Sequence, residues 1–150
     1  MKKVMLATAL AAAASFTTAS AADRNCFSAS DTEAEQAILF QTDLMVTSSA
    51  CRDPVYGEFR ARNKDLIIRY QNAMIDHFRR TGARNPKSAY DAWQTSLANE
   101  AARKQAVVST AQFCQQAVEM LKLAGTLDGK SFRDYAAARA VNGTHPRCTK

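Results

Sequence analysis

The four cysteines, at positions 26, 51, 114 and 148 of 150 residues, constrain the fold of this chain more than any other feature. An even number of cysteines in an exported protein indicates disulfides, because such proteins fold in an oxidising compartment. Four cysteines permit three pairings. Choosing between them depends on whether the chain is exported and on where its helices lie.

The first 21 residues are typical of a secretory signal peptide. Two lysines precede an apolar run over residues 4–14, and the small residues that follow fit cleavage after Ala21. The apolar run has about 11 residues, whereas a helix that crosses a bilayer core needs about 20. We therefore expect cleavage, no transmembrane anchor, and a mature protein of residues 22–150 that is periplasmic or secreted.

The composition is that of one globular domain. The chain is 47% hydrophobic and 23% charged, which is too apolar for a disordered chain, and its 5 Gly and 3 Pro exclude collagen-like and low-complexity classes. Its length suits a single domain with its own core. Removing Lys2 and Lys3 with the leader lowers the net charge from +6 to +4, a mild excess. Because no nucleic-acid docking motif accompanies this charge, we expect no nucleic-acid partner.

Apolar residues recur at helical spacing along the mature chain, and no segment reads convincingly as a strand. A first helix is expected after Ser30, whose side chain would cap it together with Glu33. Pro54 suits the first position of a second helix that ends at Gly82. One face of this second helix, mostly apolar, contains Tyr56, Phe59, Asn63, Leu66, Ile67, Tyr70, Met74 and Phe78.

The second half of the chain predicts two or three further helices. A third is expected over residues 87–108, and a fourth over residues 109–124, which open on a capping serine. One long bent helix over residues 87–124 is the alternative. A last short helix is expected over residues 131–141. The predicted fold is therefore all-α, an up-and-down bundle of four to five helices within residues 22–150, cross-linked by two disulfides.

The first helix excludes one cysteine pairing. A helix of about 20 residues is roughly 30 Å long, whereas bridged Cα atoms lie about 4.4 to 6.8 Å apart, so Cys26 cannot reach Cys51. With short connections, the end of the first helix and the start of the fourth lie at the same end of the bundle. We therefore predict Cys51 paired with Cys114 and Cys26 paired with Cys148.

No recognisable catalytic, cofactor-binding or metal-binding signature is present in the sequence, and we assign no residues to these roles. His77 lies at the edge of the second helix's apolar face and is expected to be a partly buried structural residue. His145 is expected to lie in a loop. A zinc site built from His145 and Cys148 would need two further ligands and reduced sulfur. Without a Cys-x-x-Cys motif, the cysteines read as disulfides rather than as reactive thiols.

The densest cluster of basic residues follows the second expected helix. It offers candidate contacts for an anionic envelope surface, such as lipid or polysaccharide headgroups, because positive charge attracts such surfaces. A solvated helix end is the simpler interpretation. The cluster contains Arg79, Arg80, Arg84 and Lys87.

A set of short motifs runs through the middle of the chain: Leu39-Phe40-Gln41-Thr42-Asp43-Leu44-Met45-Val46 ending at Cys51, then Tyr56 and Phe59, Tyr90-Asp91, Leu97-Ala98-Asn99-Glu100-Ala101-Ala102-Arg103 and Phe113-Cys114. Over residues 38–115 the chain resembles a group of small exported proteobacterial proteins to which no reaction is assigned. The resemblance implies a helical, disulfide-linked envelope protein. It does not extend to Cys26 or Cys148.

Three functions fit these features. The first, which we expect, is a non-catalytic periplasmic module that binds an envelope protein or an anionic envelope surface. The second is a stress chaperone, whose fold would be loosened when acid protonates its carboxylates. The third is a cell-wall hydrolase that uses two carboxylates such as Asp91 and Glu100. Both of these lie on one expected helix, and Glu100 is well placed to pair with Lys104.

Overall fold

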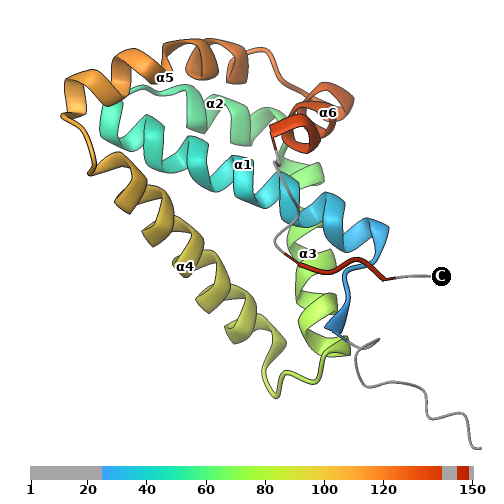
Figure 1. The fold of residues 1–150 in the computed structure, drawn as a ribbon. Helices are drawn as coiled ribbons and strands as arrows, with labels where there is room; N and C mark the ends of the chain where they lie inside the picture. The colour runs from blue at the N-terminus through green and yellow to red at the C-terminus, as the bar shows by residue number, and fades with distance from the viewer. Residues whose placement is uncertain (1–24, 140–144, 149–150) are drawn as a thin grey trace, which may run out of the picture.

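The computed structural model describes residues 25–139 and 145–148, and this part of the chain is all-α (Figure 1). The all-α class is confirmed, with six helices among the described residues rather than four to five. The expected signal peptide, residues 1–21, lies outside the described residues. The helices are α1 (Ala29–Cys51), α2 (Val55–Arg62), α3 (Lys64–Arg80), α4 (Pro86–Gln105), α5 (Thr110–Ala124) and α6 (Gly129–Arg139).

Helix α1 is the centre of the fold, and the other five helices all pack against it (Figure 1). Its buried residues lie on several faces and include Ala34, Ile38, Phe40 and Leu44. A helix that is apolar on most sides is expected to be buried inside a domain. The largest fully buried side chains of the core are Phe59, Phe132, Ile38, Leu44 and Met74.

The residue that caps α1 is Ser28, so the expectation of a cap at Ser30 was wrong by two residues. The Ser28 hydroxyl accepts a hydrogen bond from the Asp31 amide at 3.1 Å, and the Ser28 amide donates to the Asp31 carboxylate at 2.9 Å. Both serines are followed by an acidic residue at the third position, which is the spacing of a capping box. Ser28 is selected because its partner Asp31 also has partners in α3, described below.

The helix expected over residues 54–82 is divided at Asn63 into α2 and α3. The buried Asn63 amide nitrogen donates to the carbonyl oxygens of Phe59 and Leu127, each at 3.0 Å. Its side-chain oxygen accepts from the Gly129 amide at 3.0 Å. One side chain thus ties the break in the helix to the connection between α5 and α6. Leu127 and Gly129 lie more than 60 residues away in the sequence, so helical periodicity did not predict this break.

The third and fourth expected helices are separate, which excludes one long helix over residues 87–124. Helix α4 ends at Gln105, earlier than expected, and Ser109 accepts a hydrogen bond from the Gln112 amide at 3.3 Å to cap α5. Helix α6 begins at Gly129, two residues before the expected start at Ser131. The Ser131 hydroxyl instead accepts a hydrogen bond from the Asp128 amide at 2.9 Å. The expected end of this helix, at residue 141, lies outside the described residues.

Two disulfides join distant parts of the described chain, and they are the two pairs predicted from the order of the helices. Cys51 at the end of α1 is bonded to Cys114 in the first turns of α5, with 5.5 Å between their Cα atoms. Cys26 is bonded to Cys148, with 4.8 Å between their Cα atoms. Next to this second bridge, the Phe27 amide donates to the Pro146 carbonyl at 2.9 Å. Within the described segments, no helix combines the length and hydropathy needed to cross a membrane.

Candidate functional site

A cavity of about 260 Å³ lies between α1, α4, α5 and the last residue of α6. Most of its apolar surface comes from α5, with single residues from α1 and α4. Ligand sites in proteins are mostly apolar and carry a few well-placed polar groups, and the apolar surface of this cavity fits that description. The apolar lining residues are Val46, Ala101, Phe113, Ala117 and Met120.

The polar residues of the same cavity carry charges of both signs. Asp43 of α1 faces Arg139 of α6, with 4.0 Å between the carboxylate and the guanidinium. Lys104 of α4 lines the cavity and forms an ion pair with Glu100 at 2.9 Å. Burial raises the pKa of Asp43, and the positive charges of Lys104 and Arg139 offset only part of this increase. The Asp43 carboxylate therefore lies in a partly desolvated position beside two cations.

A smaller recess of about 50 Å³ adjoins the cavity and shares Asp43, Ala101 and Lys104 with it. Thr42 lines this recess and is only 2% exposed. Its hydroxyl has no hydrogen-bond partner among the described residues. Since the great majority of buried polar atoms in proteins have a partner, this unpartnered hydroxyl is an exception.

One of the disulfides fixes two walls of the cavity relative to each other. Cys51 lies one helical turn beyond Thr47, which lines the cavity, and Cys114 directly follows Phe113 on the opposite wall. Figure 1 shows the connection between α4 and α5 beside the C-terminal end of α1. The bridge therefore holds α1 and α5 at a fixed separation where the cavity lies between them.

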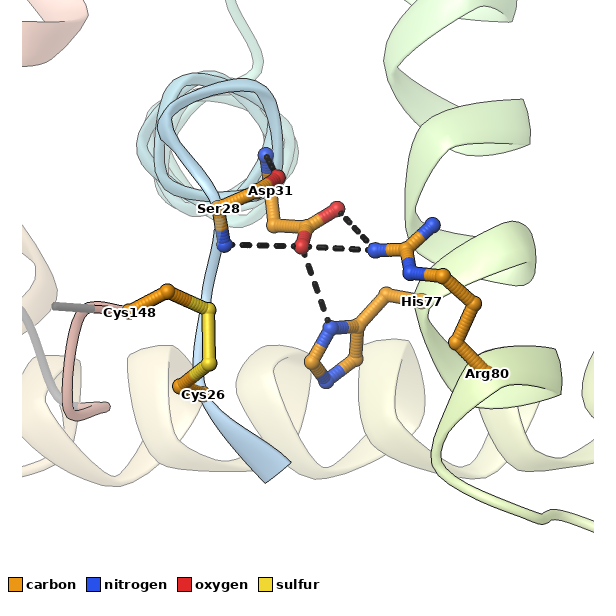
Figure 2. Close-up of a disulfide and its surroundings, with 6 residues drawn as sticks. All are labelled: Cys26, Ser28, Asp31, His77, Arg80 and Cys148. Atoms are coloured by element: carbon orange, nitrogen blue, oxygen red, sulfur yellow. Dashed lines mark hydrogen bonds and ion pairs between the residues drawn. A yellow bond between two sulfur atoms is a disulfide. The ribbon is translucent and has the colours of Figure 1, made fainter. Parts of the chain in front are cut away.

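A second polar cluster surrounds Asp31 at the start of α1, where the two described ends of the chain meet (Figure 2). Both oxygens of the buried Asp31 carboxylate accept from one Arg80 nitrogen, at 2.8 and 2.7 Å, and the His77 ring nitrogen lies 3.4 Å away. Burial raises the pKa of Asp31, but the hydrogen bonds from Arg80 and Ser28 lower it by more. The pKa of Asp31 therefore lies below its ordinary value.

The same cluster continues one helical turn along α1. Glu35 is also buried and contacts the ring nitrogen of His145 in the C-terminal segment. The ring of Phe27 contacts both imidazoles, with centroid separations of 4.1 Å to His77 and 4.4 Å to His145. Both buried carboxylates already have partners within the protein, so we interpret this cluster as the structure that fastens the chain ends. No group of three or more metal-ligating side chains occurs among the described residues.

The predicted basic residues lie at the end of α3, in the following turn and at the start of α4. Three of the four are paired with carboxylates, and Arg84 is exposed in the turn. Pairing reduces the positive charge that this region presents to solvent. Contact with an anionic surface stays a prediction. The pairs are Arg79 with Asp76, Arg80 with Asp31 and Lys87 with Asp91.

The two carboxylates considered for hydrolysis are exposed on α4 and lie in separate ion pairs. Asp91 pairs with Lys87 at 3.2 Å. Glu100 pairs with Lys104, and the hydrogen bond from Lys104 lowers the pKa of Glu100. A general acid in a glycosidase needs a raised pKa, so this environment does not suit Glu100 to that role.

The cavity residues Asp43 and Arg139 were not predicted as site residues from the sequence. The available signal was Asp43 itself, a charged residue in the middle of a helix that is apolar on most sides. Its neighbours on α4, α5 and α6 are distant in the sequence, so nothing local showed that they converge on it.

Comparison of the chain with protein-family models, with curated proteins and with solved structures found no match in any of the three. The fold and the cavity therefore give the class of the protein, which is a disulfide-linked helical domain with a cavity of mixed polarity. The resemblance to small exported proteobacterial proteins stays a prediction.

Proposed function

We propose that the protein is an exported, non-catalytic binding module of the bacterial cell envelope, and that its ligand occupies the cavity between α1, α4, α5 and α6. The observation that carries this proposal is the Cys51–Cys114 disulfide, which joins two walls of the cavity. Preorganising a site in this way favours binding, because less conformational entropy is lost when the ligand arrives.

Export is supported by the leader-like first 21 residues and by the two disulfides. The first measurement is non-reducing peptide mapping of protein collected from the periplasm. We expect a chain that begins near residue 22 with both cystines intact. Free thiols, or a retained leader, would contradict the proposed location.

Binding is tested by nuclear magnetic resonance with a library of neutral, cationic, anionic and zwitterionic fragments. We expect at least one fragment to shift the backbone amides of Val46, Phe113 and Met120 at millimolar concentration. The matched control is the double variant Cys51→Ser/Cys114→Ser, in which the walls are no longer joined and the shifts should weaken. If no fragment shifts these amides in the oxidised protein, the cavity is not a ligand site.

The stress-chaperone alternative is favoured by one observation, the pair of buried carboxylates Asp31 and Glu35 where the chain ends meet. Protonating Asp31 would weaken its hydrogen bonds with Arg80, which join the start of α1 to the end of α3. The test is suppression of aggregation of a denatured client enzyme at pH 3 and at pH 7. Activity only at pH 3 would support the chaperone, and equal inactivity at both would exclude it. The hydrolase alternative is tested by a zymogram against cell-wall material.

A further inference from the structure

We infer that the cavity binds a free α-amino acid with an apolar side chain, such as leucine, in its zwitterionic form. The inference rests on the proposed binding function and names the ligand class for that site. It follows from three features of the lining: paired charges of opposite sign, an apolar wall, and a buried hydroxyl in the adjoining recess.

The charged groups match a zwitterion. Asp43 is the acceptor for an ammonium group, while Lys104 and Arg139 are donors for a carboxylate. A simple anion would pair with Lys104 and Arg139 but would be repelled by Asp43. A simple cation would pair with Asp43 but would be repelled by Lys104 and Arg139. A ligand that carries both charges satisfies all three side chains.

The present partners of these side chains are weak enough to exchange. Arg139 lies 4.0 Å from Asp43, beyond hydrogen-bond distance. The pair between Lys104 and Glu100 is exposed and lies on one helix, and such pairs contribute little to stability. Arg139 is held in place by the ring of Tyr135, with its guanidinium carbon 5.9 Å from the ring centroid. It therefore offers a positioned charge rather than a freely moving one.

The size and the apolar wall select the side chain of the ligand. Val46, Phe113 and Met120 provide a surface for an aliphatic group. The cavity volume of about 260 Å³ lies below the range of about 300 to 1,000 Å³ that is usual for drug-sized ligands. A single apolar amino acid fits this volume better than a peptide of several residues.

The recess next to the cavity contains a further polar side chain. Thr42 is buried, and its hydroxyl has no hydrogen-bond partner among the described residues. It lines the recess together with Asp43 and Lys104.

The test is calorimetric titration of the oxidised, exported protein with leucine and with two truncated analogues. The first analogue, 4-methylpentanoate, lacks the ammonium group, and the second, 3-methylbutylamine, lacks the carboxylate. We expect leucine to bind at least tenfold more tightly than either analogue. Equal affinity for 4-methylpentanoate and leucine would overturn the inference, because a site for a simple anion would then suffice.

Single variants of Asp43 and Lys104 test which of these residues binds the ammonium group of the ligand and which binds its carboxylate. Asp43→Asn should weaken leucine at least tenfold without weakening 4-methylpentanoate. Lys104→Gln should weaken leucine and 4-methylpentanoate without weakening 3-methylbutylamine. The control is Lys87→Gln, which removes an equivalent ion pair, with Asp91, from the other end of the same helix. An equal loss of leucine binding in Lys87→Gln would contradict a role for the cavity residues.

The outcome separates this inference from the proposed function. If leucine fails to bind while other fragments still shift the cavity amides, the ligand class is wrong and the binding function stands. If neither leucine nor any fragment shifts the resonances of these amides, both proposals are wrong. Competition between leucine and a bound fragment would support both.

Discussion

Asp31 shows how one buried carboxylate can determine where a helix begins. It completes the capping box with Ser28 and also accepts from Arg80, which approaches from the end of α3. The sequence permits the capping spacing at both Ser28 and Ser30, and only the long-range partner distinguishes the two. The position of this cap was therefore not predictable from local spacing alone. By contrast, the cap at Ser109 has no competitor nearby and was predicted correctly.

We predict that Asp31→Asn lowers the free energy of unfolding by about 2 kcal/mol at pH 7, because charged hydrogen bonds contribute about 1.5 to 3 kcal/mol and Arg80 is half exposed. The folded-state pKa of Asp31 lies below its ordinary value of 3.8. Its contribution is therefore complete above that value and is lost as the pH falls through the lowered pKa.

Urea unfolding at pH 7 and at acidic pH measures this effect. The control is Asp91→Asn, which removes an exposed carboxylate from its pair with Lys87 and should change stability by less than about 0.5 kcal/mol. Equal effects of the two substitutions at pH 7 would show that the Asp31 cluster has no special role.

Asp43 is expected to behave in the opposite way. Burial raises the pKa of Asp43 in the folded protein. Above this raised pKa the charged carboxylate destabilises the fold, whereas at low pH the carboxyl group is neutral in both the folded and the unfolded protein and has no such effect. We predict that Asp43→Asn raises the free energy of unfolding at pH 7 or leaves it unchanged. The increase should stay below about 1 kcal/mol, because the carboxylate is partly exposed to solvent. The difference should disappear at pH 3. Thermal unfolding at both pH values checks this, and a large loss of stability at pH 7 would contradict it.

At the scale of elements, the periodicity of apolar residues located the helices, shifted several of their ends by two or three residues, and missed the division between α2 and α3. The apolar face of the expected second helix continues from Phe59 to Ile67 across the break, so its pattern gives no sign that the chain is divided there. The break depends on the buried amide of Asn63 and on partners near the start of α6. The start of α4 depends on nearby residues and was predicted within one residue: the helix begins at Pro86, and the expected start was residue 87.

We predict that Asn63→Ala lowers the free energy of unfolding by about 2 to 3 kcal/mol. The substitution removes three hydrogen bonds and takes this partner away from the carbonyl of the buried Leu127 and from the amide of Gly129. Asn72→Ala, on an exposed position of α3, is the matched control and should change stability by less than about 0.5 kcal/mol. Denaturant unfolding compares the two. A small effect at both positions would mean that the junction of α2, α3 and α6 is held by apolar packing alone.

At the scale of the whole molecule, the order of the helices was enough to predict which cysteines meet. The cavity was not predictable in this way, because it depends on how far α4 separates from α5 and on where Arg139 ends α6. Pairing is a matter of topology, whereas the shape of a cavity depends on side-chain packing between elements. Predicting the charges that line it would have required knowing that packing.

We predict that removing either disulfide is more destabilising than any of the substitutions above. The sequence separations are 122 for Cys26–Cys148 and 63 for Cys51–Cys114, and the chain-entropy estimate for such loops is about 4 to 5 kcal/mol. Double serine variants, compared by urea unfolding, measure both. Only Cys51→Ser/Cys114→Ser should also weaken ligand binding, because the other bridge lies among the chain ends. Equal weakening by both variants would mean that binding reflects overall stability rather than the joined walls.

The bridge between Cys26 and Cys148 also changes what a protease can achieve. With its two ends covalently joined, the chain from one cysteine to the other is a closed ring, and the second bridge divides that ring into two smaller circuits. The exposed turn at Gly82 lies between Cys51 and Cys114, in the circuit that the second bridge closes. A cut there leaves two fragments connected by two cystines. The fragments stay joined until a reductant separates them, so a cut at this turn would not be visible on a non-reducing gel.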